Sequence, residues 1–160
     1  MTADGFHPQV VAFCCRHCAY AAADLAGGNR VSYPSAVKIV ELPCTGRIDI
    51  VNVLHAFEDG ADGVLVAGCL EGSCHFVKGN LYARRRIERI RALLGEIGLE
   101  PARARMVNMS AAMARPLADT ITDMVETIRK LGPSPLKSNG KSVSACGCCA
   151  VTPAQSNGKP

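Results

Sequence analysis

Nine of the 160 residues are cysteines, and six of these occur before residue 75. A cysteine thiolate can bind zinc or an iron–sulfur cluster, and a pair of thiols can exchange disulfides. A cysteine that does neither packs as a small apolar residue. The positions of the cysteines in the fold decide among these chemistries. The six early cysteines are Cys14, Cys15, Cys18, Cys44, Cys69 and Cys74.

The cellular compartment bears on what these cysteines do. The first residues have no basic start that leads into a long apolar stretch, so we expect no signal peptide. No apolar run reaches the roughly 18 residues of a membrane span, and we expect a cytoplasmic protein. Disulfides are rare in a reducing compartment, and an odd number of cysteines argues against a complete disulfide framework. Metal binding or thiol chemistry is therefore favoured.

The composition argues against several classes of function. The formal net charge of +4 is mild, and the chain has three tyrosines, four phenylalanines and no tryptophan. So few aromatic residues argue against a base-stacking surface for nucleic acid. The chain has neither a G-x-G-x-x-G motif nor a P-loop lysine motif, which argues against a nucleotide site. The basic excess instead suits an acidic protein partner.

Patterns that predict strands alternate along the chain with patterns that predict helices. The expected strands are 9–14, 36–44, 62–69 and a weaker one at 103–109. The expected helices are 17–25, 49–58, 80–97 and 111–131. This order predicts right-handed crossovers and an α/β fold, with a small, open, mostly parallel four-stranded sheet and helices on both faces.

The composition changes at Gly132. The sequence from there on is rich in proline, glycine, serine, asparagine and lysine, and it has no periodicity. We therefore expect one α/β domain at 1–131 and a flexible, cysteine-containing tail at 132–160. The tail cysteines, Cys146, Cys148 and Cys149, leave three roles open: a second metal site, a disulfide, or incidental thiols.

Each early cysteine lies at or just after the end of an expected strand. Because parallel strands end at one shared edge of a sheet, three separate segments should deliver sulfur to the same place. Open α/β sheets bind their ligands at that edge, above all where the strand order reverses. If the first strand lies between the second and the third, the reversal is beside Cys15. Thiolates that converge from several loops suit zinc or an iron–sulfur cluster.

The spacing of the cysteines bears on the kind of metal site. Cys15-x-x-Cys18 is one short pair, and Cys69 and Cys74 form another with four residues between them. Cys44 comes alone from a different strand. This scatter fits a cluster in a preformed pocket better than a zinc knuckle. A [2Fe–2S] cluster takes four ligands, so six candidates leave at least two to spare.

Four segments carry a resemblance to a known family. They are FCCRHCAYAAADLAG, YPSAVKIVELPCTGRID, AFEDGADGVLVAGCLEGSCHFVKGN and RRRIERIRALLGEIGLEPARARMVNMSA. In this order, over about residues 10–131, the sequence resembles the delta subunit of the methyl-viologen-reducing hydrogenase. The resemblance implies a small [2Fe–2S] protein that relays electrons and does not itself turn over substrate. It implies two kinds of partner: a hydrogenase, formate dehydrogenase or other dehydrogenase subunit, and the flavin-containing subunit of a heterodisulfide reductase-like complex.

The resemblance also implies a set of metal ligands. The cysteine pattern of the family falls on Cys15, Cys18, Cys44, Cys69 and Cys74, and Cys14 ranks below these five. Two positions depart from the family. Residue 17 is histidine where the family usually has tryptophan, and residue 70 is leucine where it usually has histidine. Neither departure removes a thiolate, but the second removes a hydrogen-bond donor near sulfur, which would shift the reduction potential.

Two other functions remain open at this point. Cys15 and Cys18 could form the redox pair of a thiol–disulfide oxidoreductase, although such an enzyme needs two sulfurs and not five or six. A zinc-stabilised interaction module is the third candidate. Among the charged residues, Arg47 could tune a cluster or meet a partner carboxylate, or it could be an ordinary surface residue. The run 84–86 is an exposed helix face or a docking site for an acidic partner.

Overall fold

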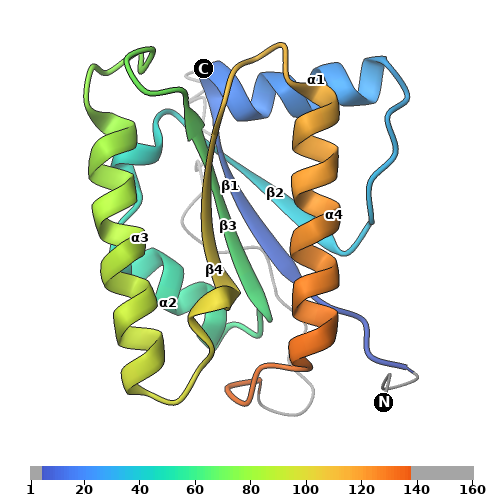
Figure 1. The fold of residues 1–160 in the computed structure, drawn as a ribbon, viewed down its shortest axis with the longest axis vertical. Coiled ribbons are helices and arrows are strands. Elements are labelled where there is room, and N and C mark those ends of the chain that lie inside the picture. Colours follow the sequence, from blue (N-terminus) through green and yellow to red (C-terminus); the bar gives the residue numbers. More distant parts are fainter. Residues whose placement is uncertain (1–4, 138–160) are drawn as a thin grey trace, which may run out of the picture.

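The computed structural model describes residues 5–137, which form an α/β fold (Figure 1). The strands are β1 (Val10–Cys15), β2 (Val37–Leu42), β3 (Gly63–Cys69) and β4 (Ala104–Met109). The α-helices are α1 (Ala21–Gly28), α2 (Ile50–Glu58), α3 (Gly79–Glu96) and α4 (Ala114–Leu131). A π-helical turn at Arg16–Tyr20 precedes α1, and 3₁₀ turns at Thr45–Arg47 and Pro101–Arg103 precede α2 and β4.

The four strands form one sheet in the order β2-β1-β3-β4, and every neighbouring pair is parallel. The chain moves outward from β1 to β2, then returns past β1 to β3 and continues to β4. The strand order therefore reverses between β1 and β3, as the sequence predicted for this arrangement. Cys15 is the last residue of β1 and Cys69 is the last residue of β3, so both lie at the point of reversal.

Helices cover both faces of the sheet, as expected (Figure 1). On one face α1 and α4 pack against the even-numbered residues of β1, among them Val10 and Ala12. On the other face α2 and α3 pack against Val11 and the alternate residues of β3. All seven residues of β3 are buried, which explains its continuous apolar sequence. No helix among the described residues is long and apolar enough to cross a membrane.

The expected elements are all present, and their bounds differ from the expected ones by a few residues. The largest difference follows β1, where residues 16–20 form a π-helical turn before α1 begins. Pro116 lies in the first turn of α4, where a backbone N–H has no partner within the helix, so this proline does not interrupt it. The cysteines of the expected tail lie outside the described residues.

The amino edge of the sheet, opposite the cysteines, is closed by a buried carboxylate. Asp62 is fully buried and accepts hydrogen bonds from the backbone N–H groups of Gln9 and Ser134, each within 2.9 Å. It also accepts from the ammonium of Lys137, 3.0 Å away. Arg103 is buried as well and donates to the carbonyls of Asp62 and Gly132, both at 3.0 Å. These bonds hold residues 132–137 against the sheet.

Candidate metal centre

Three cysteine sulfurs meet at the carboxyl edge of the sheet. The sulfurs of Cys15, Cys18 and Cys69 all lie within 4.8 Å of one another, and all three residues are buried. The Cys15 and Cys69 sulfurs are 3.6 Å apart. A tetrahedral zinc ion with bonds of about 2.3 Å separates two sulfurs by roughly 3.8 Å. The sulfurs of Cys15 and Cys69 therefore already have the spacing of two ligands on one metal ion.

The backbone explains why these three sulfurs converge. β1 and β3 are neighbours in the sheet, so their last residues, Cys15 and Cys69, lie side by side. The π-helical turn then carries Cys18 back toward the strand ends, where it is buried. Single π-helical turns are rare and occur often at functional sites. No pattern in the sequence indicated this turn, because its residues also suit an ordinary α-helix.

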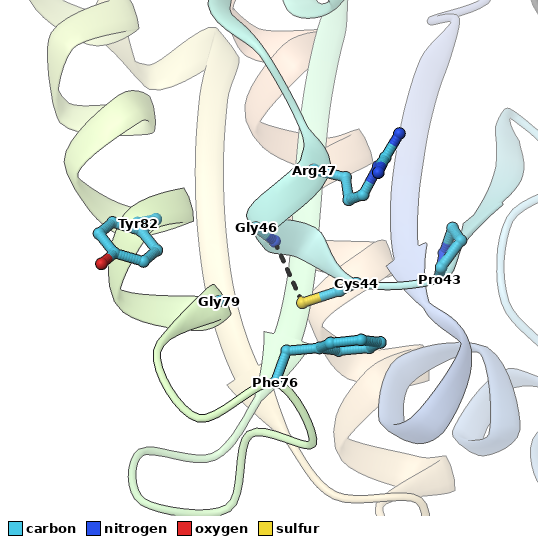
Figure 2. A pocket seen from close by; sticks show the side chains of 7 residues that line it. All are labelled: Pro43, Cys44, Gly46, Arg47, Phe76, Gly79 and Tyr82. Atoms are coloured by element: carbon cyan, nitrogen blue, oxygen red, sulfur yellow. Dashed lines mark hydrogen bonds between the residues drawn. The ribbon is translucent and has the colours of Figure 1, made fainter.

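Two more sulfurs lie at the start of α3. A Cβ atom placed on Gly79 would be 2.3 Å from the Cys44 sulfur and 3.2 Å from the Cys74 sulfur. The Cys44 sulfur also accepts a hydrogen bond from the backbone N–H of Gly46, at 3.4 Å (Figure 2). Only a residue without a side chain fits at position 79. The first turn of α3 and the turn after β2 thus bring Cys44 and Cys74 together.

The pKa values separate the cysteines at the strand ends. A hydrogen bond from the Cys18 thiol, opposed by burial, lowers the pKa of Cys15 to about 5. The same bond, together with burial, raises the pKa of Cys18 above its usual range. Burial is the largest cause that raises the pKa of Cys69. In the absence of a cation, one thiolate is therefore stable here and its neighbours stay protonated. A metal is the group that would allow several of them to ionise together.

The pair at the start of α3 behaves differently. Burial raises the pKa of Cys44, and the neighbouring Cys74 and Cys15 add to the rise. Burial also opposes ionisation of Cys74, but the backbone N–H groups of residues 76, 79 and 80 outweigh it and lower the pKa of Cys74. The Cys15 sulfur lies 3.9 Å from the carbonyl of Pro43, the residue before Cys44. The pair at the start of α3 is therefore a neighbour of the three sulfurs at the strand ends.

Cys14 is separate from these five. Cys14 is fully buried in the core under α1 and α4, on the same face of the sheet as Val10 and Ala12. Burial, followed by the neighbouring Cys15, raises the pKa of Cys14 to about 12. A thiol of this kind packs as a small apolar residue.

Side-chain amides and a guanidinium hold the backbone around the sulfurs. The buried Asn80 donates to the carbonyls of Cys69 and Leu70, both at 3.0 Å. Asn108 donates to the same Cys69 carbonyl at 2.5 Å. One nitrogen of Arg86 donates to the carbonyls of Gly46 and Ile48, both at 2.7 Å.

Nothing in the sequence singled out these roles. The asparagines had no motif around them, and Arg86 stood in a run of three arginines. Of that run, Arg84 pairs with Glu71 at the surface, and Arg86 alone holds the turn that carries Cys44. The role of Arg86 can be told from that of the neighbouring arginines only by its contact with this turn in the folded structure.

Two cavities open beside the sulfurs. One, of about 220 Å³, is lined by Cys44, Arg47, Phe76 and Tyr82 among others (Figure 2). The second, of about 330 Å³, is lined by residues that include Cys18 and Cys69. The rings of His17 and His75 stack between the loops, with centroids 4.1 Å apart, and Phe76 packs edge-on against His75. The sulfurs are thus covered by only a thin layer of side chains.

Fold and site together define a small doubly wound α/β domain with a cluster of cysteines at the edge where the strand order reverses. The chain belongs to the family of the methyl-viologen-reducing hydrogenase delta subunit, whose family model matches residues 10–132. The resemblance seen in the sequence is confirmed.

Relatives of two kinds share this sequence. The vhu F420-non-reducing hydrogenase iron-sulfur subunit of Methanocaldococcus jannaschii is 46% identical over 130 residues, which cover 81% of this chain and 97% of that protein. The F420-non-reducing hydrogenase iron-sulfur subunit of Archaeoglobus profundus is 44% identical, over 80% of this chain and 93% of that protein. A larger chain, from the ferredoxin:CoB-CoM heterodisulfide reductase of Methanosarcina mazei, is 43% identical over 79% of this chain, but the match covers only 16% of that protein.

Proposed function

We propose that this protein is an electron-transfer subunit that carries one [2Fe–2S] cluster. The cluster takes its four ligands from Cys15, Cys18, Cys44, Cys69 and Cys74. The protein relays electrons from a hydrogenase, formate dehydrogenase or other dehydrogenase subunit to the flavin-containing subunit of a heterodisulfide reductase-like complex. The observation that carries this proposal is that three buried cysteine sulfurs lie within 4.8 Å of one another at the strand ends, with a second pair of cysteine sulfurs beside Gly79.

The arrangement of the sulfurs supports a cluster with two metal ions. Cys15 and Cys69 have the spacing of two ligands on one ion, and Cys44 and Cys74 form a second pair beside Gly79. A [2Fe–2S] cluster has two irons with two protein ligands each. The hydrogenase relatives are named as iron-sulfur subunits, which supports iron over zinc.

The two kinds of relative support the proposed identity of the partners. The sequence that makes up this domain is nearly a whole protein in the hydrogenase relatives and a small part of a larger chain in the heterodisulfide reductase relatives. A domain that occurs both as a separate protein and within the same chain as a larger enzyme works beside that enzyme. On this ground, the corresponding large chain of a heterodisulfide reductase-like complex is the partner of choice.

Thiol–disulfide exchange is the second candidate, because the pKa of Cys15 is about 5 and Cys18 is its neighbour. Exchange requires access of a substrate disulfide to the attacking sulfur. Cys15 is 1% exposed and Cys18 is 3% exposed, so neither sulfur is open to a protein disulfide. Burial therefore favours the electron-transfer proposal.

Purification without oxygen, followed by metal and sulfide analysis, tests the proposal. We expect a coloured protein with two iron atoms and two sulfides per chain and a visible spectrum that bleaches on reduction. Colourless protein with bound zinc would support the zinc-stabilised module instead. Colourless protein free of metal, with one fast-reacting thiol, would support thiol–disulfide exchange.

A further inference from the structure

The loop after β3 and the start of α3 expose an unusual number of large apolar side chains. Ten such side chains are exposed among the described residues, and five of them lie in the segment 70–82. Four of the five form what we call the 76–82 patch: Phe76, Val77, Leu81 and Tyr82. Phe76 and Tyr82 both line the cavity that reaches Cys44 (Figure 2). Two of the four residues of the patch therefore border the cavity at the Cys44 sulfur.

Val77 is the most informative residue of the patch. It is 77% exposed, and its φ is 62°, in the left-handed region. This conformation is strained for a β-branched residue and unstrained for glycine. Strain of this kind persists where the surrounding structure enforces it, and it gathers at functional sites.

The backbone around Val77 explains the conformation but not the side chain. The turn lets the N–H of Val77 donate to the Cys74 carbonyl at 2.9 Å, and it directs the N–H groups of Phe76 and Gly79 at the Cys74 sulfur. Glycine at position 77 would form the same turn without strain. An exposed valine side chain gains little within the chain itself, and a contact with a surface outside the chain would account for its presence.

Charges around the patch indicate what kind of surface this is. Arg47, Lys78 and Arg85 are exposed beside it, and Arg47 lines the same cavity as Phe76 and Tyr82. Nearby, Arg84 and Glu71 pair with each other. The border of the patch is therefore positive, and an apolar surface bordered by carboxylates is its complement.

We propose that the 76–82 patch is the docking surface for the electron-transfer partner, and that the partner meets it with an apolar surface bordered by Asp and Glu side chains. This inference rests on the proposed function for the identity of the partner. Cys74 is the least buried of the five candidate ligands, and it lies under this patch. The rate of electron transfer falls steeply with distance. A partner that covers the patch approaches the cluster where the fewest protein atoms separate the cluster from the surface.

Affinity measurements with matched variants test the docking surface. The full chain, loaded with iron, is titrated with the flavin-containing heterodisulfide reductase-type protein of the same organism. We expect Val77→Gly and Tyr82→Ser each to weaken binding about tenfold, as truncation of a central interface side chain does. Arg85→Glu should slow association and reduce its dependence on salt. Ile97→Ser is the control, because Ile97 is also exposed but lies at the other end of α3.

The outcomes separate this inference from the proposed function. Iron content and the visible spectrum should be unchanged in all four variants, and Val77→Gly should keep or raise the melting temperature. The docking surface would be overturned if Val77→Gly and Tyr82→Ser bound the partner with full affinity, or if the unchanged chain did not bind it. Neither result would contradict the proposed cluster. Self-association that is lost in Val77→Gly would assign the patch to a second copy of the chain and overturn the proposal. A chain that holds no iron after anaerobic purification but still binds through the patch would overturn the cluster instead.

Discussion

At the scale of single residues, similar cysteines have different environments. Cys14 and Cys15 are adjacent in sequence, yet the pKa of Cys14 is raised to about 12 and the pKa of Cys15 is lowered to about 5. Burial dominates the first, and a hydrogen bond from Cys18 dominates the second. The difference follows from strand geometry, because successive side chains of a strand point in opposite directions. One thiol enters the core and the other reaches the carboxyl edge.

This difference predicts opposite results for two cysteine substitutions. Cys69→Ser removes a sulfur 3.6 Å from that of Cys15, and it should strongly reduce, but not abolish, iron binding and visible absorbance. Cys14→Ala should leave both unchanged and should lower stability by only about 1 kcal/mol, as the loss of a small buried group does. Iron analysis and absorbance after anaerobic purification measure the outcome. Loss of iron in Cys14→Ala would show that the ligand set is wrong.

Asn80 is predicted to position a ligand without binding the metal itself. Asn80→Ala removes the two hydrogen bonds that the Asn80 amide donates to the carbonyls of Cys69 and Leu70, and the one that it accepts from the Leu81 N–H. Asn108 and the Ser73 N–H remain as the donors to these two carbonyls. We expect a loss of about 1–3 kcal/mol in the free energy of unfolding and a shifted reduction potential. Asn108→Ala is the matched comparison, because the Asn108 amide donates to the Cys69 carbonyl alone, whereas the Asn80 amide donates to two carbonyls. Urea unfolding and redox titration of both proteins measure the effects, and an unchanged potential in Asn80→Ala would contradict the positioning role.

At the scale of elements, the sequence predicted the parts of the site that depend on local pattern. The apolar runs of β1 and β3 are long enough to be recognised, and parallel strands must end at a common edge. The approach of Cys15 to Cys69 follows from those two facts. The π-helical turn could not be predicted from the sequence, because its residues fit an α-helix equally well. The role of Arg86 could not be predicted either, because it depends on the packing of α3 against a turn 38 to 40 residues earlier.

Two glycines of α3 should respond in opposite ways to the same substitution. Gly79→Ala places a Cβ 2.3 Å from the Cys44 sulfur, so it should displace Cys44 and reduce iron binding. Gly95→Ala meets only Pro101, at 3.8 Å, and should stabilise the protein by up to about 1 kcal/mol through helix propensity. Iron content and thermal unfolding distinguish the two. Normal iron content in Gly79→Ala would show that Cys44 and the start of α3 need not lie so close.

At the scale of the whole molecule, the two edges of the sheet have separate tasks. The carboxyl edge carries the sulfurs, the cavities and the 76–82 patch. The amino edge carries the buried Asp62 and Arg103 and the half-buried Lys137, which pairs with Asp62. Figure 1 shows the sheet between these edges, with α1 and α4 on one face and α2 and α3 on the other. We therefore expect that stability can be altered at the amino edge without a change at the sulfurs.

This separation predicts the result of a change at the amino edge. Asp62→Ala leaves two backbone N–H groups and the Lys137 ammonium without their acceptor. We expect the free energy of unfolding to fall by about 3 kcal/mol or more, since these are hydrogen bonds to a buried charge. The visible spectrum and reduction potential of the protein that remains folded should not change. A shifted potential would show that the two edges are coupled.

X-ray absorption at the iron edge of the anaerobically purified protein tests the central claim most directly. The measurement reports the atoms that surround each iron. We expect sulfur alone around each iron and one iron neighbour, and we expect fewer sulfur neighbours per iron in Cys69→Ser. Oxygen or nitrogen ligands around a single iron, or an iron site that is the same in Cys69→Ser, would contradict the claim that these cysteines hold a cluster.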